Sequence, residues 1–114
     1  MAWRIEYSES ALKELRKLDK GKAKKILDYL DKKIAKMVDP SEAGKALTGK
    51  LASFWRYRVG DMRVICHIDQ NIITVLVLRI AHRSVVYDDE KTISAKANKE
   101  VDALKKRNPK DRKQ

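Results

Sequence analysis

The sequence predicts a small single domain of the α+β class, in which an N-terminal strand and a two-helix hairpin pack on an antiparallel sheet (β-α-α-β-β-β), with a C-terminal helix after it. Three observations lead to this fold class: an alternating apolar pattern opens the chain, two apolar stripes with helical spacing follow, and three strand-like segments come next. A chain of 114 residues has the usual length of one domain. We expect a compact domain over residues 1–87, a helical extension over 88–107 and a disordered basic tail over 108–114.

The first half of the chain is predicted to hold one strand and two helices. Residues 2–7 alternate between apolar and charged side chains, as a half-buried strand does. Ser8 suits a helix N-cap, and Glu9 lies where its charge favours the positive end of the helix dipole. Apolar residues with helical spacing predict a first helix to about residue 20 and a second over about residues 22–38, stopped by Asp39-Pro40. The short link between them predicts an antiparallel helical hairpin.

The second half is predicted to be mostly sheet. A loop over residues 41–53 leads to three strands over residues 54–59, 62–68 and 72–80. Gly60-Asp61 is a two-residue loop of the kind that closes a tight hairpin. The last strand is apolar at nearly every position, which is typical of a central strand covered on both faces. A sparse apolar stripe then predicts a terminal helix to about residue 105, ended by Asn108-Pro109.

The charge balance points to an anionic partner. Lys and Arg total 27 against 16 Asp and Glu, so the net charge is +11 and the pI is near 9.8. A protein this basic suits a polyanion, either nucleic acid or an acidic protein. Residues 51–90 contain five arginines and no lysine. Arginine grips phosphate or carboxylate with two hydrogen bonds, so this segment indicates anion recognition, although strands also disfavour lysine. The lysines of the second helix are interpreted as a solvated face, with contact to a nucleic-acid backbone as the alternative.

Several classes of function are excluded by composition. No apolar run approaches the roughly 20 residues that a membrane span needs, and no signal-peptide pattern opens the chain. Cys66 is the single cysteine, which excludes an intramolecular disulfide and fits a reducing cytosol, so we expect a cytoplasmic protein. With two histidines and one cysteine, a structural zinc site is not expected, and we expect no metal or other cofactor.

Three arginines are predicted to share one face of the hairpin. A two-residue loop places Arg58 opposite Arg63, with Cβ atoms roughly 5 Å apart, and places Arg56 on the same face. Like charges so placed destabilise a sheet. A bound polyanion would relieve the repulsion, and an acidic protein would serve equally well. Alternatively, the side chains splay into water and the repulsion is screened. We favour an anion site because local rules tend to be broken at functional sites. The other face is apolar and carries Trp55, Tyr57, Val59, Met62, Val64 and Cys66.

A second polar cluster follows the last strand. Strand parity places Arg79 and Arg83 on the same face as the hairpin arginines. His82 is the only histidine near these arginines and is a candidate acid or base, with a purely hydrogen-bonding role as the alternative. Tyr87 is either part of the site or an edge of the core. Lys45, in the preceding loop, is a further candidate for binding RNA.

The sequence resembles the RelE family of bacterial and archaeal toxin–antitoxin toxins over residues 1–87. The resemblance rests on Trp3-Arg4-Ile5-Glu6-Tyr7 with Ala11-Leu12-Lys13-Glu14-Leu15, on Phe54-Trp55-Arg56-Tyr57-Arg58-Val59-Gly60-Asp61-Met62-Arg63-Val64-Ile65, and on Ala81-His82-Arg83 with Val86-Tyr87. It implies an endoribonuclease that cleaves messenger RNA in the A site of the ribosome and inhibits translation. It also implies an acidic, RelB-like antitoxin that holds the toxin inactive in a hetero-oligomer, and contact with the small ribosomal subunit.

The resemblance also implies roles for the basic residues. In RNA the 2′-hydroxyl lies beside the phosphate that it attacks, so the enzyme has to orient it, neutralise charge on the phosphate and manage two protons. Arg58, Arg63 and Arg83 are expected to clamp that phosphate. Arg56, Arg79 and Lys45 are expected to bind the RNA backbone. Tyr87, for base stacking or proton transfer, and His82 are further catalytic candidates. Lysines replace Arg56 and Arg58 in the best-known members, and a mechanism with a lysine proton acceptor does not apply because arginine stays charged.

Two alternatives remain open at the level of sequence. One is a ParE-like toxin, which shares the fold but inhibits DNA gyrase without nuclease activity. The other is a non-catalytic module whose basic face binds RNA or the antitoxin. The Arg83 and Tyr87 pair favours the nuclease over the gyrase inhibitor. The C-terminal helix is also expected to cover apolar sheet surface that an antitoxin segment would otherwise occupy.

Overall fold

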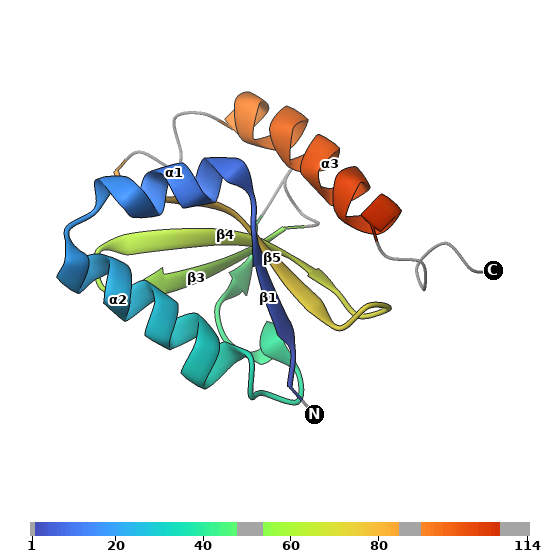
Figure 1. Ribbon diagram of the computed structural model, residues 1–114, viewed down its shortest axis with the longest axis horizontal. Helices are drawn as coiled ribbons and strands as arrows, with labels where there is room; N and C mark the ends of the chain where they lie inside the picture. The colour runs from blue at the N-terminus through green and yellow to red at the C-terminus, as the bar shows by residue number, and fades with distance from the viewer. Residues whose placement is uncertain (1, 48–53, 85–89, 108–114) are drawn as a thin grey trace.

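The chain folds around one mixed sheet with helices on both faces. A computed structural model describes residues 2–47, 54–84 and 90–107. Within these residues the five strands lie in the order β1-β5-β4-β3-β2. The strands are β1 (Arg4–Tyr7), β2 (Lys45–Ala46), β3 (Trp55–Val59), β4 (Met62–Asp69) and β5 (Thr74–His82). The helices are α1 (Glu9–Lys17), α2 (Lys20–Asp28) and α3 (Glu90–Arg107), with a π-helical turn η1 (Tyr29–Ile34) and a 3₁₀ turn η2 (Pro40–Glu42) (Figure 1).

The predicted fold class is confirmed, with one correction to the sheet. Neighbouring strands from β2 to β5 pair antiparallel, but β1 pairs parallel with β5, from Arg4 opposite Thr74 to Tyr7 opposite Val77. The sheet is therefore mixed rather than antiparallel. A parallel pair needs a crossover connection, and the helical hairpin is part of the long connection that the chain makes between β1 and β5.

The helix caps are those that the sequence indicates. Ser8 is the N-cap of α1, and its Oγ accepts a hydrogen bond of 3.0 Å from the Ala11 N–H. The same hydroxyl donates to the Leu78 carbonyl at 2.9 Å, which ties the start of α1 to β5. Asp19 caps α2 by accepting from the Lys22 N–H at 2.8 Å. The link between α1 and α2 is therefore very short, as predicted.

The second helix ends earlier than the predicted residue 38. After Asp28 it widens into η1, in which the Ala35 N–H donates to the Leu30 carbonyl, five residues back, at 2.8 Å. The Ala35 carbonyl then accepts from the Trp3 N–H at 2.7 Å, so the end of this helix is fixed against the start of the chain. Asp39-Pro40 does not stop the helix: Asp39 caps η2 instead.

The predicted hairpin register is confirmed at each pair. Val59 lies opposite Met62, Arg58 opposite Arg63, and Arg56 opposite Ile65. The strand boundaries move by one or two residues, since β3 begins at Trp55 and β5 spans Thr74–His82. The predicted loop over residues 41–53 was wrong in part, because its described residues include η2 and the short strand β2. The register of β4 against β5 shifts between Ile65 and Cys66: Arg79 lies opposite Ile65 and Val77 opposite Cys66, so β5 contains one extra residue at this point.

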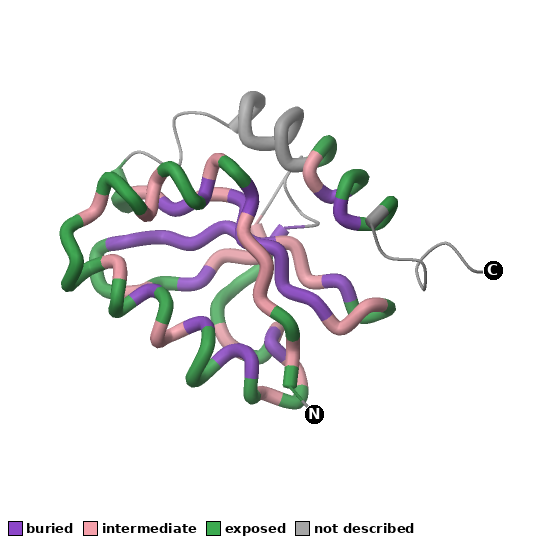
Figure 2. Tube along the Cα trace, viewed as in Figure 1, coloured by how far each residue is buried: buried purple, intermediate pink, exposed green. Residues whose placement is uncertain are grey.

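Each face of the sheet has its own core. On one face α1, α2 and η1 pack against the sheet with Ala11, Ile26, Leu30 and Ile34, all fully buried, around Tyr57 and Val64. On the other face α3 contributes Val101 and Leu104 to a second cluster, whose other members are Phe54, just before β3, and Ile65, Leu76 and Leu78 of the sheet. The buried stretches of the central strands in Figure 2 reflect this double cover. As predicted, β5 is covered on both faces.

The C-terminal helix is present and reaches Arg107, two residues beyond the predicted end. It covers apolar sheet surface, as the sequence analysis expected of it. Asn108-Pro109 and the basic tail over 108–114 lie outside the described residues. In the described part of the chain, no helix is both long and apolar enough to cross a membrane.

Candidate nucleic-acid interface

The two opposed arginines of the hairpin, Arg58 and Arg63, differ in their exposure and in their hydrogen bonds. Arg58 is exposed, whereas Arg63 is only 9% exposed. The Arg63 Nη1 donates to the Gly60 carbonyl at 3.1 Å and to the Met62 carbonyl at 2.9 Å. Because carbonyl oxygens carry partial negative charge, these two hydrogen bonds offset part of the electrostatic repulsion between Arg63 and Arg58. Arg63 therefore lies folded over the turn rather than splayed into water.

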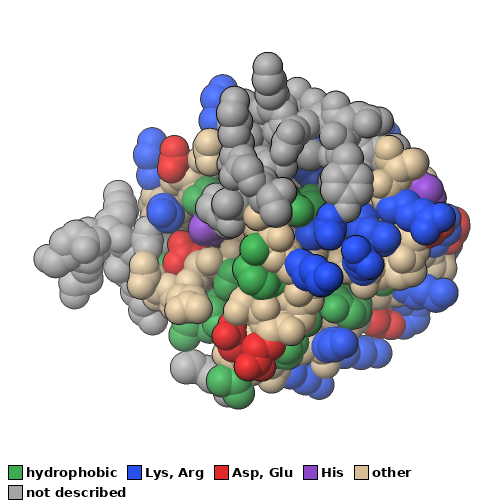
Figure 3. Space-filling view, turned by 180° about the vertical axis from the view of Figure 1, so that it is seen from behind, with side chains coloured by type: hydrophobic (Ala, Val, Ile, Leu, Met, Phe, Trp, Pro, Cys, Tyr) green, Lys and Arg blue, Asp and Glu red, His purple; other side chains and the backbone are tan. Residues whose placement is uncertain are grey.

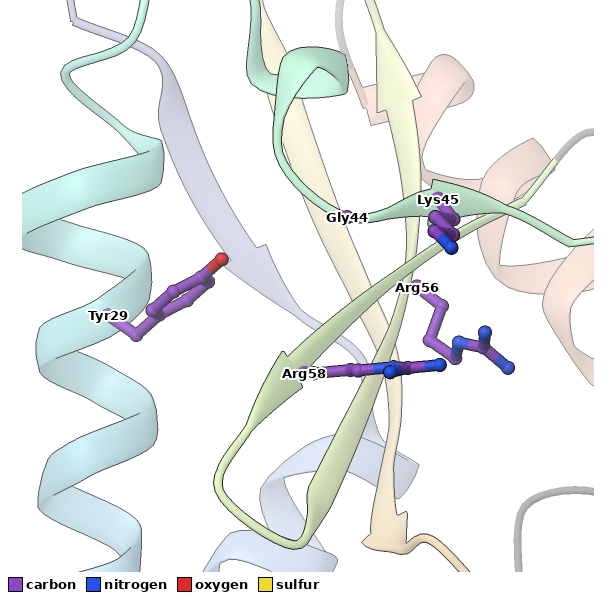
Figure 4. Close-up of a pocket in the computed structure, with 5 residues that line it drawn as sticks. All are labelled: Tyr29, Gly44, Lys45, Arg56 and Arg58. Atoms are coloured by element: carbon purple, nitrogen blue, oxygen red, sulfur yellow. The ribbon is translucent and has the colours of Figure 1, made fainter.

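A further pair of basic residues lies at the edge of the sheet. Lys45 of β2 is the cross-strand partner of Arg56 of β3, so the two side chains share a face. Together with Arg58, Tyr29 and Gly44, they line a pocket of about 210 Å³ (Figure 4). This pocket contains no carboxylate among its lining residues. The structure thus brings Lys45, Arg56 and Arg58 together.

The end of β5 is fixed to the hairpin turn. The Arg83 N–H donates to the Asp61 carbonyl at 3.0 Å. The Asp61 carboxylate lies 3.6 Å from the His82 Nε2 and 3.9 Å from the Lys22 Nζ. Asp61 therefore places Arg83 and His82 beside the turn that carries Arg58 and Arg63. Sequence reasoning missed this role, because Asp61 showed there only as a turn residue.

The orientation of His82 follows from its second ring nitrogen. Nδ1 accepts a hydrogen bond of 3.2 Å from the Ser84 N–H and lies 2.8 Å from the Ser84 Oγ. Since Nδ1 is an acceptor, the neutral ring carries its proton on Nε2, which faces Asp61. His82 thus lies beside the hairpin turn with both ring nitrogens in contact with other residues.

Arg79 lies on the predicted face, opposite Ile65, yet it is not directed at an external anion. Its Nε and Nη2 both lie 2.9 Å from the Glu14 Oε2 of α1. The Glu14 Oε1 accepts from the Ile80 N–H at 2.7 Å. Glu14 therefore covers the edge of β5 beyond the end of β1. This ion pair favours an anchoring role for Arg79 over the expected role in RNA binding.

The surface around these residues is basic. In the view from behind, Lys and Arg side chains gather on one side of the molecule (Figure 3). Tyr87, the last predicted site residue, lies outside the described residues. Among the residues that the structure describes, no group of three or more His, Cys, Asp or Glu is placed to hold a metal ion. The site presents hydrogen-bond donors and positive charge, which suit the oxygens of phosphate.

Tyr29 is a site residue that sequence reasoning did not single out. It lies at the first position of η1, and its side chain points toward β3 (Figure 4). Burial, with a smaller contribution from Cys66, raises the pKa of the Tyr29 hydroxyl above its usual value of 10.0, so the group stays protonated at neutral pH. One feature of the sequence could have identified it: Tyr29 is an aromatic residue outside the apolar stripe of the second helix.

Comparison with known proteins gives consistent matches. A sequence model for the ParE toxin of the type II toxin–antitoxin system parDE matches residues 5–87. Toxin RelG of Mycobacterium tuberculosis (strain ATCC 25618 / H37Rv) is 26% identical over 87 residues, covering 76% of this chain and 98% of RelG.

Two solved structures with a similar fold are toxin–antitoxin complexes. A chain of the toxin–antitoxin complex RelBE2 from Mycobacterium tuberculosis matches with a TM-score of 0.67 and 25% identity, covering 74% of this chain and 94% of that chain. A chain of the archaeal RelE–RelB complex from Pyrococcus horikoshii OT3 matches with a TM-score of 0.58 and 25% identity, covering 75% and 99%.

The fold and the basic site define a toxin of a type II toxin–antitoxin system. The chain belongs to the ParE toxin family, within the RelE/ParE superfamily. The resemblance to RelE-type toxins that the sequence indicates is thereby confirmed at the level of the superfamily.

Proposed function

We propose that this toxin is a ribosome-dependent endoribonuclease that cleaves messenger RNA and inhibits translation. The observation that carries the proposal is the arginine arrangement at the hairpin turn. Arg58 lies opposite Arg63, and the backbone of Arg83 is hydrogen-bonded to the same turn. Three guanidinium groups attached around one turn suit a reaction in which negative charge grows on a phosphate. The implied activity of RelE-type relatives supports the same conclusion.

In the proposed reaction, the 2′-oxygen of one nucleotide attacks the adjacent phosphorus, and the 5′-oxygen of the next nucleotide leaves. The products are a 2′,3′-cyclic phosphate and a 5′-hydroxyl. Arg58 and Arg83, which are exposed, contact the phosphate oxygens and stabilise their charge, and the mostly buried guanidinium of Arg63 adds positive charge from the turn. Arg56 and Lys45 hold the RNA backbone. None of the arginines accepts a proton, because each stays charged.

His82 can take part in proton transfer only after its hydrogen bond with Ser84 is broken. Its Nδ1 accepts from the Ser84 N–H, so the ring has to leave Ser84 before that nitrogen can take the proton of the 2′-hydroxyl. Tyr87 is proposed to stack on a base or to share in proton transfer. With no pre-set base, we expect slow cleavage of free RNA and efficient cleavage only where the ribosome orders the substrate.

The proposed partners follow from the charge. An acidic, RelB-like antitoxin would cover the basic surface in a toxin–antitoxin hetero-oligomer, and the small ribosomal subunit would bind through its RNA. Two of the matched structures are toxin–antitoxin complexes, which supports the first of these partners. We propose that the protein acts in the cytoplasm, where messenger RNA is translated.

The proposal is tested by expressing the chain under tight control and mapping messenger RNA ends on ribosomes. Codon-phased cuts that leave a 2′,3′-cyclic phosphate are expected. Arg83→Ala is expected to abolish these cuts while the folded state, measured by circular dichroism and urea unfolding, is retained, because Arg83 is exposed. Cleavage by Arg83→Ala at the parental rate would overturn its assignment.

The second candidate function is inhibition of DNA gyrase, which the match to the ParE family favours. The same cultures distinguish the two functions. Gyrase-linked DNA breaks without codon-phased RNA ends would support the gyrase inhibitor. Growth without either effect would support a non-catalytic module that binds RNA or the antitoxin.

A further inference from the structure

The end of β5 departs from regular strand pairing at one residue, Leu78. Val77 lies opposite Cys66 of β4. Arg79 lies opposite Ile65, so Leu78 is an extra residue and forms a β-bulge. Bulges re-aim the side chains that follow them and are frequent beside active sites. In this chain the residues that follow include the members of the candidate site at the end of β5.

The bulge decides where the later residues of β5 lie. If the same sequence paired regularly after Val77, Arg79 would lie opposite Val64, whose side chain is fully buried in the core beneath α1 and α2. Burying an unpaired guanidinium there is costly. Regular pairing would also carry His82 past its observed partner Met62, which begins β4. The bulge therefore keeps Arg79 out of this core and brings His82 to the hairpin turn.

The bulge is held by Ser8, the residue that caps α1. The Ser8 N–H donates to the Val77 carbonyl at 2.9 Å, and the Ser8 Oγ donates to the Leu78 carbonyl, also at 2.9 Å. The carbonyls of consecutive residues point to opposite sides of a regular strand, so one residue reaches both only at an irregularity. The same Oγ accepts from the Ala11 N–H at 3.0 Å, and Ser8 is only 7% exposed. The start of α1 is therefore attached to the bulge itself.

Glu14, one turn and a half further along α1, holds the residues that follow the bulge. Its Oε1 accepts from the Ile80 N–H at 2.7 Å, and its Oε2 lies 2.9 Å from both the Nε and the Nη2 of Arg79. The strand β1 ends at Tyr7, opposite Val77, so β5 loses its strand neighbour at the point where the bulge begins. The helix α1, which follows β1 directly, takes over as the neighbour of β5 from there (Figure 1).

We propose that Ser8 and Glu14 are positioning residues for the cleavage reaction: they hold the bulge in the form that places His82 and Arg83 at the hairpin turn. On its other side this segment is held by the Arg83 N–H, which donates to the Asp61 carbonyl at 3.0 Å. Neither Ser8 nor Glu14 touches the RNA. A displacement of about 1 Å at the reacting groups can slow a reaction about 100-fold. The role of His82 and Arg83 in cleavage rests on the proposed function, whereas the attachment of the bulge to α1 does not.

The first test compares two buried hydroxyls that donate to carbonyls at opposite ends of β5. Ser8→Ala removes the bond to the bulge, and Thr74→Ala removes a bond of 2.9 Å to the Ile72 carbonyl near the start of the strand. On programmed ribosomes, Ser8→Ala is expected to lower kcat about tenfold and to leave KM within about twofold, because the reacting groups are misplaced while the RNA contacts remain. Thr74→Ala is expected to keep kcat within about twofold, and Ser8→Thr, which keeps the hydroxyl and the cap, is expected to restore it. Equal losses of kcat in Ser8→Ala and Thr74→Ala, or a change in KM alone, would overturn the proposal.

The second test separates anchoring by Arg79 from binding of RNA by Arg79. Glu14→Gln keeps an oxygen for the Ile80 N–H and removes the charge that faces the Arg79 guanidinium. If Glu14 positions the end of β5, this change lowers kcat by about threefold or more and leaves KM unchanged. If Arg79 instead binds the RNA, the loss of its partner frees the guanidinium, so KM falls and kcat does not. The second result would overturn the proposal.

NMR of the full chain distinguishes a failure of this inference from a failure of the proposed function, because it requires no cleavage. Ser8→Ala is expected to shift the amide signals of residues 78–83 and the His82 ring signals, and to speed hydrogen exchange of the Arg83 N–H. Thr74→Ala is expected to confine the shifts to the start of β5. Unchanged His82 and Arg83 signals in Ser8→Ala would overturn the inference. If these signals move in a chain that cuts no RNA, the proposed function is contradicted and the attachment of the bulge to α1 is supported.

Discussion

The basic side chains of this protein fall into two groups: some are held by contacts within the fold, and others are exposed and can bind a ligand. Arg79 is committed to Glu14, and Arg63 is partly committed to the carbonyls of its own turn. Arg58 and Lys45 are exposed, and in the described part of the chain neither forms an ion pair. Identical residue types on one face thus have different chemistry, because a guanidinium that is already paired has less to offer to phosphate.

Glu14 is expected to be the most important surface carboxylate for stability. It accepts hydrogen bonds from the Arg79 side chain and from the Ile80 N–H, and its side chain is only 22% exposed. Glu14→Ala leaves both donors unpaired, so we expect a loss of about 2 to 3 kcal/mol in the free energy of unfolding, measured by urea denaturation. Glu42→Ala, which removes an exposed carboxylate, is the matched control and is expected to change it by less than about 0.5 kcal/mol. Equal effects of the two changes would contradict the anchoring role.

Buried phenols predict a loss of stability at alkaline pH. Burial is the main cause that raises the pKa of Tyr57 and Tyr7 far above their usual value of 10.0. The unfolded chain therefore releases these protons at a lower pH than the folded chain does. The corresponding stability is fully present below about pH 10 and is lost progressively as the pH rises above it. Urea midpoints measured from pH 8 to 11 test this, and a midpoint that rises above pH 10 would contradict it.

At the scale of elements, the local sequence was enough to predict the hairpin but not the short strand β2 at the edge of the sheet. A two-residue loop allows one register, so the opposition of Arg58 and Arg63 followed from Gly60-Asp61. The strand β2 has two residues, too few for any alternating pattern. The π-helical turn shifts the backbone hydrogen bonds while its buried residues Leu30 and Ile34 keep helical spacing, so the sequence pattern did not reveal it.

The site could be predicted only in part, because several of its contacts join residues that are far apart in the sequence. Glu14 and Arg79 are 65 residues apart, and Asp61 meets His82 only after β5 has been placed beside β4. The basic residues themselves were predictable, because composition and strand parity identify them. Their partners were not, since no local rule relates an acidic residue on a helix to the open edge of a strand. The sequence analysis therefore named the cations of the predicted site but not the acidic residues, Glu14 and Asp61, that contact some of its members.

Three glycines give a graded test of how β2 is held. Gly21→Ala is expected to stabilise α2 by about 0.5 to 1 kcal/mol, because alanine favours helix and the added Cβ meets only the Asp19 Oδ1 at 3.4 Å. Gly60→Ala is expected to cost about 1 kcal/mol, since φ is 62° but no atom lies within 4 Å. Gly44→Ala combines the left-handed backbone with overlap against β3, so the expected cost is about 3 kcal/mol. Urea unfolding ranks the variants, and equal costs for Gly44→Ala and Gly60→Ala would show that β2 is free to move.

At the scale of the whole molecule, the sheet separates two cores of unequal extent. Among the residues whose side chains the structure describes, the cluster beneath α1 and α2 contains eleven buried residues, whereas the cluster beneath α3 contains six, of which α3 supplies Val101 and Leu104. Stability is not uniform when elements contribute unequally to burial. We therefore predict that α3 opens more readily than the sheet, as the predicted division into residues 1–87 and a helical extension requires.

Hydrogen exchange of backbone amides tests this division. Leu104 of α3 and Leu30 of η1 are both fully buried, each in the core on its own face of the sheet. Replacing a buried leucine by alanine costs about 2 to 5 kcal/mol. If α3 opens separately, Leu104→Ala should speed exchange in α3 at least tenfold and leave the slowest amides of β4 and β5 nearly unchanged. Leu30→Ala should speed exchange in those strands as well, because it weakens the larger core. Should Leu104→Ala speed exchange of β4 and β5 as much as that of α3, the extension and the compact domain unfold as one cooperative unit, and the division at residue 87 is wrong.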